Sequence, residues 1–275
     1  MSLLLLAPRI NETGLRLLTS ARRRGLRAHT ATRWEVPAEL AGLRPAHLYG
    51  GPLFADVASA ALGVAPLEPP ADWLTTLPSD LLGRRVECTT LAEARRLRRP
   101  AFVKPPVDKL FPARIYPDGS GLPGPDALDD DTPVLVSDIV AFTEEFRLFV
   151  LDGAVRAASR YAVDGALAVS PSVGPDARAF AADVLAACAH GGADGSTGSG
   201  VGVGSGVGLP GAVVVDIGRT ADGWAVVEAN PAWASGGYAC DPDAVLDVVL
   251  RAAGPAELLT AVDAPFVRPV CTVVR

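Results

Sequence analysis

Three oxygen-bearing side chains in the last quarter of the chain have the types and the spacing of a metal site. Asp216 stands near the end of an alternating apolar run, and Glu228 and Asn230 stand two residues apart on the next run. Residues 221–223 supply turn chemistry, so the two runs predict a β-hairpin. Alternation places Glu228 and Asn230 on one face, and pairing across the turn can bring Asp216 beside them. Such oxygens suit Mg²⁺, which keeps positions for water and phosphate. An acid at a strand end before an Asn-Pro turn is also ordinary loop chemistry.

Composition restricts the possible partners. The 275 residues can bury a substantial core, and the net charge of -6 gives no electrostatic argument for a nucleic acid or a membrane surface. Two arginine clusters, at residues 22–27 and 95–99, are expected to be solvated helix faces. We therefore expect no nucleic-acid partner.

Cysteine usage and the apolar start indicate the compartment. The cysteines are scattered, without the close pairing of a zinc ribbon or a redox dithiol: Cys88, Cys188, Cys240 and Cys271. Residues 3–7 are apolar but far too few to span a bilayer, and the features of a signal peptide are missing. The sequence therefore predicts a cytoplasmic protein without a membrane partner.

The first eighty or so residues read as a small α/β sheet domain. We expect strands at residues 3–7, 26–30 and 46–49, and helices after a cap at Asn11 and over residues 53–62. The glycines of this region form no dinucleotide-binding fingerprint, and Gly50-Gly51 is expected to be a turn. The order of elements is typical of an α/β layer.

A second unit is expected from about Cys88 onward. Thr89 or Thr90 can cap a helix that runs through Arg99, and antiparallel strands are predicted to follow. Residues 107–128 are rich in Pro, Gly and Asp and predict a mobile flap with one short hairpin. Residues 191–208 are almost wholly Gly, Ser and Val and predict a flexible connector without chemistry.

An ordered set of motifs in this second unit resembles the ATP-grasp superfamily. The set is Phe102-Val-Lys104-Pro105, the run at 134–140, Glu145-Phe-Arg147, Arg160, Asp216 and Glu228-Ala-Asn230-Pro231. The run from Lys104 to Tyr116, followed by Glu145-Phe-Arg-Leu-Phe-Val-Leu-Asp-Gly153, resembles a bacterial and phage ATP-grasp clade named for two arginines and a lysine. The resemblance implies an α/β (α+β) fold in which an ATP-grasp domain, residues 88–275, follows a Rossmann-like pre-ATP-grasp domain, residues 1–87. Its subdomains would be residues 88–140, with the flap, and 141–275, with the connector.

The resemblance also implies which side chains hold the nucleotide phosphates. Lys104 would contact phosphate, a task that suits a point cation on a flexible stem. Lys109, in the flap, is a weaker candidate for the same task. Arg147 and Arg160 would face the γ-phosphate and the reacting carboxyl group, since a guanidinium pairs with either and stays charged. Arg147 could instead form a cross-strand ion pair with a neighbouring acid.

The base, the ribose and the metal are assigned in the same way. Asp138, Ile139 and Val140 match the hinge that surrounds adenine, although Ser137-Asp138 departs from the acid-first hinge of many members. Glu145 matches the acid that contacts ribose, with Glu144 as the rival. The three oxygen donors of the hairpin would then bridge Mg²⁺ to the β- and γ-phosphates of ATP.

The function implied is an ATP-dependent carboxylate-amine ligase that acts through an acylphosphate. Its partners would be a small-molecule or peptide carboxylate and an amine, and the flap would exclude water from the acylphosphate. A small-molecule kinase and a non-catalytic nucleotide-binding module are the alternatives, because a fold does not prove an activity. Residues at strand ends of the first domain are candidates for an acceptor pocket: Arg9, Arg33, Tyr49 and Gly50.

Overall fold

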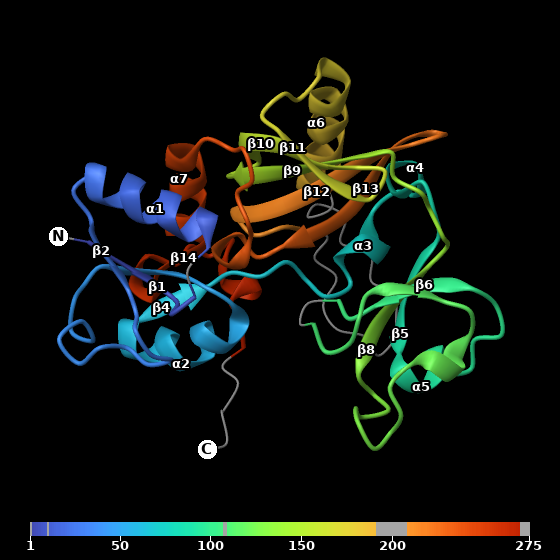
Figure 1. Ribbon diagram of the computed structural model, residues 1–275, viewed down its shortest axis with the longest axis horizontal. Helices are drawn as coiled ribbons and strands as arrows, with labels where there is room; N and C mark the ends of the chain where they lie inside the picture. Colours follow the sequence, from blue (N-terminus) through green and yellow to red (C-terminus); the bar gives the residue numbers. More distant parts are fainter. Residues whose placement is uncertain (1, 10, 107–108, 191–207, 270–275) are drawn as a thin grey trace.

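The computed structural model describes residues 2–9, 11–106, 109–190 and 208–269 (Figure 1). A unit built from the N-terminal residues and a smaller sheet built from residues 86–137 stand at opposite ends of the long axis. A five-stranded sheet lies between them in the fold, with helices on its two faces. These three parts define the spaces in which a ligand can lie.

The N-terminal unit is a parallel sheet with helices. Its strands, in the order β2-β1-β3, and its helices are β1 (Leu3–Leu6), β2 (Arg27–Thr30), β3 (Ala46–Tyr49), α1 (Glu12–Arg23) and α2 (Pro52–Leu62). All residues of central β1 are buried, as expected for a parallel strand covered on both faces. The Asn11 side chain caps α1 by accepting a hydrogen bond from the Gly14 amide at 2.7 Å. The predicted β-α-β order and the cap are confirmed, whereas the Rossmann-like assignment of this unit stays a prediction.

The chain after α2 ties distant parts of the sequence together. The short strand β4 (Val64–Pro66) pairs antiparallel with β14 (Ala253–Pro255), so the end of the chain returns to the N-terminal unit. Two short helices, α3 (Trp73–Thr76) and α4 (Ser79–Leu82), then pack against β13 (Gly223–Asn230). The boundary near residue 87 stays a prediction.

The smaller sheet has four antiparallel strands in the order β5-β8-β6-β7. Its elements are β5 (Val86–Thr90), α5 (Leu91–Ala94), β6 (Ala101–Lys104), β7 (Arg114–Tyr116) and β8 (Pro133–Ser137). Thr90 caps α5 as predicted, but the helix ends at Ala94 rather than running through Arg99. At Gly119 a Cβ atom would stand 2.1 Å from the Arg95 carbonyl oxygen, so a packed segment meets the chain where the helix would continue.

The described part of the predicted flap, residues 109–128, packs against this sheet. Phe111, Tyr116 and Leu122 are buried in one core with Leu91 and Val103. Strand β7 pairs with β6, which lies outside residues 107–128, so the described part of the flap contributes one strand to the sheet rather than the short hairpin of its own that was predicted. The mobility of the segment stays a prediction.

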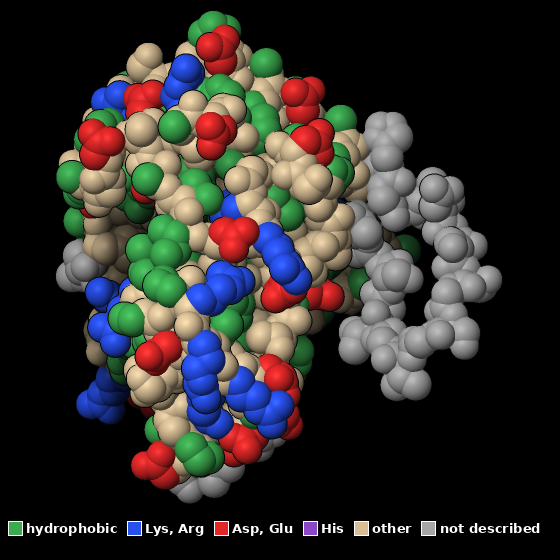
Figure 2. Space-filling model, turned by 90° about the vertical axis from the view of Figure 1, so that its right-hand side faces the viewer, with side chains coloured by type: hydrophobic (Ala, Val, Ile, Leu, Met, Phe, Trp, Pro, Cys, Tyr) green, Lys and Arg blue, Asp and Glu red, His purple; other side chains and the backbone are tan. Residues whose placement is uncertain are grey.

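The second arginine cluster lies on the solvent side of this sheet. Arg96 pairs with Glu93, and Arg99 pairs with Asp138 at 3.5 Å. Lys and Arg side chains stand beside Asp and Glu side chains on this end of the molecule (Figure 2). Arg96, Arg98 and Arg99 are exposed as expected, but the cluster follows the end of α5 instead of forming a helix face, and Arg95 is half-buried against the Pro123 and Leu128 carbonyls.

The central sheet is antiparallel, in the order β11-β10-β9-β12-β13. Its further elements are β9 (Glu144–Leu151), β10 (Ala154–Val163), β11 (Ala166–Ser170) and β12 (Ala212–Thr220), with the helices α6 (Pro175–His190) and α7 (Pro242–Ala252). Leu148 and Val215 share a core with α6, whereas Phe149 and Val214 share one with α7 and the N-terminal unit. Both faces are therefore covered, and the predicted connector lies outside the described residues apart from Gly208.

Candidate active site

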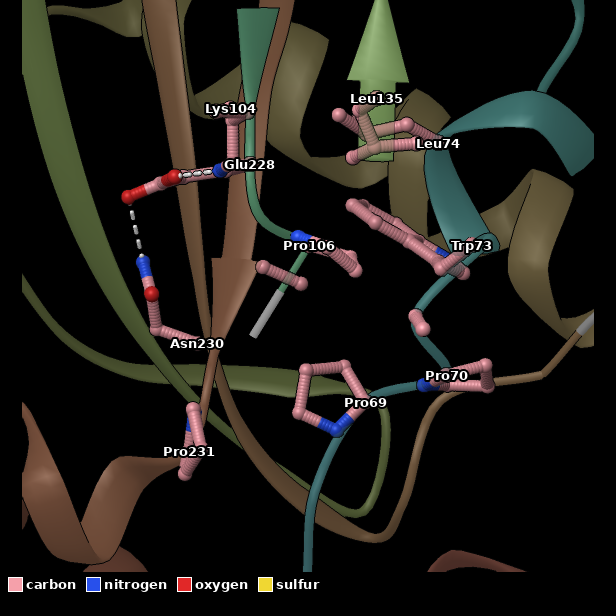
Figure 3. Close-up of a pocket in the computed structure, with 12 residues that line it drawn as sticks. Pro69, Pro70, Trp73, Leu74, Lys104, Pro106, Leu135, Glu228, Asn230 and Pro231 are labelled. Carbon is pink, nitrogen blue, oxygen red and sulfur yellow. Dashed lines mark hydrogen bonds and ion pairs between the residues drawn. The ribbon is translucent and has the colours of Figure 1, made fainter. Parts of the chain in front are cut away.

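The predicted hairpin forms and brings its three polar side chains together. Asp216 stands directly opposite Glu228, and Val214 stands opposite Asn230. The Asn230 amide nitrogen donates to Glu228 Oε1 at 2.8 Å and lies 3.4 Å from Asp216 Oδ2. Asn230 and Glu228 point toward one another in Figure 3. The predicted juxtaposition of the three side chains is confirmed.

The donor set suits Mg²⁺ better than a softer ion. Among the described residues, no three His, Cys, Asp or Glu side chains cluster as a metal site. The hairpin instead offers two carboxylates and one amide, a partial set of hard oxygen ligands that leaves room for water and phosphate. A half-turn of the Asn230 amide would present its oxygen, in place of its nitrogen, to an ion between these groups.

Lys104, the last residue of β6, joins the smaller sheet to this hairpin. Its ammonium pairs with Glu228 Oε2, and the two side chains are 14% and 29% exposed. Burial works against ionisation of Glu228, but Lys104 and Asn230 hold the pKa of that carboxyl below its ordinary value. Glu228 is therefore charged at neutral pH, with its partner on the facing sheet. Lys109 is exposed on the loop after β6 and does not line this site.

Arg147, on β9, makes a two-pronged ion pair with Asp216. Its Nε and Nη2 atoms donate to the two carboxylate oxygens at 2.9 and 2.6 Å, and Nη1 donates to the Gly236 carbonyl at 3.3 Å. The Asp216 side chain is only 1% exposed. Burial works against the guanidinium charge, but Asp216 holds the pKa of Arg147 above its ordinary value. Burial also raises the pKa of Asp216, and the guanidinium opposes that shift.

Two aromatic rings fix the Arg147 guanidinium further. Its central carbon lies 5.6 Å from the Tyr161 ring centre and 5.2 Å from that of Tyr238, and the two rings stack at 5.1 Å. Tyr161 also donates its hydroxyl to Glu145 at 2.7 Å. Burial raises the pKa of Tyr161, and Asp216 and Glu145 raise it further, so this hydroxyl stays a donor.

Arg160 lies outside this network. It pairs with Glu144 at 2.9 Å and donates to the Ala168 carbonyl at 3.3 Å. Its partner across the sheet is Phe146, which belongs to the core under α6. Arg160 stands opposite Phe146 and Arg147 stands opposite Ser159, so the two arginines lie on opposite faces of the sheet and Tyr161, not Arg160, is the neighbour of Arg147. The transfer role expected for Arg160 stays a prediction.

A cavity of about 420 Å³ opens between the smaller sheet and the central sheet. Six residues expected at the nucleotide line it: Lys104, Asp138, Ile139, Val140, Glu145 and Glu228. Glu144 does not line it, so the two adjacent acids have different surroundings. The Asp138 amide donates to the Arg85 carbonyl at 3.1 Å.

Sequence reasoning missed much of the cavity wall. Val86, Phe102, Ile115 and Leu135 supply its apolar surface from different strands; all but Val86 stand within the quoted motifs, but none was assigned to the nucleotide from the sequence. Arg84 also lines it, donating to the Val226 and Val227 carbonyls at 2.7 and 3.1 Å. Burial lowers the pKa of Arg84, opposed by Glu228. These contacts hold Arg84 beside Glu228, a pairing that only the tertiary fold creates.

The Lys104 and Glu228 pair separates this cavity from a smaller one of about 20 Å³ (Figure 3). Lys104, Glu228, Leu74 and Leu135 line both spaces. In Figure 3, Pro69, Pro70 and Trp73 close the small space on the side away from this ion pair. The ion pair is therefore accessible from two directions.

Comparison with solved structures shows the fold. The ATP-grasp ligase PsnB complexed with a minimal precursor matches with a TM-score of 0.50 at 15% identity, over 91% of this chain and 99% of that one. D-alanine–D-alanine ligase from Bacillus anthracis matches with a TM-score of 0.49 at 13% identity, over 90% of this chain and 95% of the other. A RimK domain ATP-grasp protein from Sphaerobacter thermophilus gives 0.48 at 16%, over 91% and 100%. The fold is the ATP-grasp fold.

The family follows from the sequence itself. Residues 81–248 match the model of the ATP-grasp domain of family 2 in the clade named for two arginines and a lysine, so the chain belongs to this family. The predicted superfamily and clade are confirmed, and the family supports ATP binding and ATP-grasp ligase activity in general terms. No curated protein matches the chain. No described helix is long and apolar enough to cross a membrane.

Proposed function

We propose that this protein is an ATP-dependent carboxylate-amine ligase that acts through an acylphosphate. The observation that carries the proposal is the 420 Å³ cavity between two sheets, whose lining combines apolar side chains with charged groups. Lys104, Glu145 and Glu228 line it, and Arg147, two residues from Glu145 on β9, is bound to Asp216. Such a space suits a nucleotide, whose base is apolar on its faces and whose phosphates are anionic.

The chain would hold ATP from three sides. Phe102, Ile139 and Val140 would enclose the adenine. Because the Asp138 amide is already bonded to Arg85, hydrogen bonds from the hinge to the base would fall on Ile139 and Val140. Glu145, whose neighbour Glu144 is tied to Arg160, would contact the ribose.

Asp216, Glu228 and Asn230 would hold Mg²⁺. The ion, when bound, neutralises phosphate charge and aligns the terminal phosphoryl group. Lys104 now pairs with Glu228, and we expect its ammonium to turn to phosphate when the nucleotide enters.

Arg147 would act on the transferring phosphoryl group and the carboxylate that receives it. In the first step, a carboxylate oxygen attacks the γ-phosphorus atom, and ADP leaves. In the second step, an amine nitrogen attacks the acyl carbon, inorganic phosphate leaves, and the amine loses a proton. Both steps pass negative charge through oxygen atoms, which a fixed guanidinium stabilises without reorganising.

Ala113 and Ile115, from the segment predicted as a flap, line the same cavity. This placement supports a covering role, which would keep water from the acylphosphate. The three described cysteines are free thiols, in line with the proposal that the protein works in the reducing cytoplasm.

One experiment separates this proposal from its alternatives. Purified protein is incubated with ATP and Mg²⁺, with single carboxylates or amines and then with mixtures of both, and ADP release is measured. A ligase needs both acceptors, a small-molecule kinase needs one, and a non-catalytic binding module releases no ADP. Release with a single acceptor, or no release while ATP binds, would contradict the ligase.

A further inference from the structure

A second cavity, of about 240 Å³, lies in the N-terminal unit, away from the nucleotide cavity. It stands where the parallel strands β1 and β3 end, at the edge of the sheet. Its wall includes Arg9, Asn11, Leu15, Trp34, Tyr49 and Gly50. Of the four strand-end residues suggested by the sequence, Arg33 is the one that does not line it.

The charge of this cavity is one-sided. Among the described residues that line it, Arg9 is the one with a charge, although the whole chain has a net charge of -6. The nearby acids have other partners: Glu12 pairs with Arg16 at 2.6 Å, and Glu35 lies 3.9 Å from Arg33. Within the described residues, Arg9 forms no ion pair. An uncompensated guanidinium at a cavity wall favours an anionic ligand, above all a carboxylate or a phosphate that can bind in two-pronged fashion.

Apolar side chains that are partly open to solvent form one part of the wall, beside the polar side chains of Asn11, Thr30 and Tyr49. Leu15 and Trp34 line the cavity and are each 52% exposed. The Trp34 ring packs edge-on against Phe54 with ring centres 6.0 Å apart, so it has a fixed support. A large ring held at a cavity mouth offers surface to an apolar group. This wall favours a carboxylate that carries an apolar side chain over a strongly hydrated phosphate.

A short stretch of chain connects this cavity to the Arg147 network. The Tyr49 hydroxyl donates to the Ser235 carbonyl at 3.0 Å, and Ala234 lines the cavity. In the same stretch, the Gly236 carbonyl accepts a hydrogen bond from Arg147 Nη1 at 3.3 Å. Residues 234–236 therefore contact both the cavity beside Arg9 and the guanidinium of Arg147.

Gly50 has a different task. A Cβ atom at this position would stand 2.7 Å from the Ala7 Cβ, so Gly50 allows two strand ends to approach closely. Its amide donates to the Trp233 carbonyl at 2.9 Å. Gly50 therefore holds the end of β3 against the segment from Trp233 to Gly236, and Arg147 donates to the last residue of that segment.

We propose that the N-terminal cavity binds one substrate of the ligase, a small molecule or peptide end that carries a carboxylate next to an apolar group. Arg9 pairs with the carboxylate, and Leu15 and Trp34 contact the apolar part. The identification of the ligand as a substrate rests on the proposed ligase function. The binding of an apolar carboxylate does not.

The test measures binding without ATP. N-acetyl-L-leucine and N-acetyl-L-phenylalanine are titrated into the full chain alongside the corresponding amides, and tryptophan fluorescence is recorded. Trp34 is the most exposed tryptophan, since Trp73 and Trp233 are 2% and 0% exposed and Trp224 is half-buried. The acids are expected to change this signal and to bind at least about tenfold more tightly than the amides, a typical effect of a charge-assisted hydrogen bond. The Trp34→Phe variant should lose the signal.

Arg9→Gln is expected to remove the preference for acids. Arg33→Gln is the matched control, because it deletes the same charge from a residue outside the wall that is 82% exposed. Equal binding of acids and amides, no binding of any acid at millimolar concentration, or equal loss in the two variants would overturn the proposal. Failure of the ligase is recognised separately, because the cavity would still bind the acids while no pair of acceptors releases ADP.

Discussion

The two cavities differ in whether their charged side chains are paired. Around the 420 Å³ cavity between the two sheets, the central charges are paired across strands or across sheets, Lys104 with Glu228 and Arg147 with Asp216. In the N-terminal cavity, Arg9 has no carboxylate partner among the described residues. A network of paired charges suits a ligand that carries charges of both signs, as a nucleotide with its cation does. Each side chain can then exchange its partner for a group of the ligand, and no buried charge is left unpaired. A single cation instead selects one sign.

The largest effect is expected from breaking the Arg147 pair. Arg147→Ala would leave Asp216 buried and unpaired, at a cost of about 3–5 kcal/mol, so the cleaner change is Arg147→Lys. Lysine keeps the charge but cannot bind both Asp216 oxygens. We expect ATP turnover to fall by about 10³-fold, with the circular dichroism spectrum unchanged. Activity near that of the wild type would remove Arg147 from phosphoryl transfer.

Glu228→Gln should come next. The change is nearly isosteric but removes the charge that pairs with Lys104 and that would hold the cation. Turnover should fall by at least about 100-fold, with a higher Mg²⁺ concentration needed for half-maximal rate. Asp222→Asn, in the exposed turn of the same hairpin and outside both cavities that Glu228 lines, is the control. An unchanged Mg²⁺ requirement in Glu228→Gln would contradict the metal assignment.

The Arg160→Gln variant tests whether an arginine outside the Arg147 network takes part in the reaction. Its contacts, to Glu144 and to the Ala168 carbonyl, point to a role in holding the sheet edge. We therefore expect less than a tenfold loss of kcat, compared with about 10³-fold for Arg147→Lys. Steady-state rates of the two variants decide the matter. An equally large loss would return Arg160 to the transfer step.

The smallest effect is on stability and depends on pH. The pKa of Glu228 is below its ordinary value in the folded protein, so its pairing stabilises above the unfolded pKa and is lost as pH falls through the lower folded pKa. Lys104→Met should lower the free energy of unfolding by about 1–3 kcal/mol near neutral pH. The difference from wild type should shrink below about pH 4, as measured by urea denaturation. A difference independent of pH would mean that packing, not charge, accounts for it.

Local patterns in the sequence predicted a large part of this site. The β12 and β13 hairpin follows from alternation and a short turn, which together decide which side chains share a face. Lys104 at the end of β6 and the hinge at residues 138–140 were likewise recognisable as ordered motifs, and they line one cavity. The end of α5 was not predictable, because it depends on Gly119, more than twenty residues away in the chain.

By itself, the sequence determined the family, the hairpin with its three oxygen donors, and the strand that carries Lys104, since each depends on residues near one another in the chain. Only the tertiary structure decided between Glu144 and Glu145 as cavity residues and separated Arg147 from Arg160. The physical reason is strand register: Arg160 stands opposite Phe146 and Arg147 opposite Ser159, successive residues of β9 face opposite sides, and only the folded sheet decides which side meets the cavity. The cavity beside Arg9 likewise forms between the strand ends of the N-terminal unit and residues 234–236. These segments are far apart in the sequence and meet only when the chain has folded.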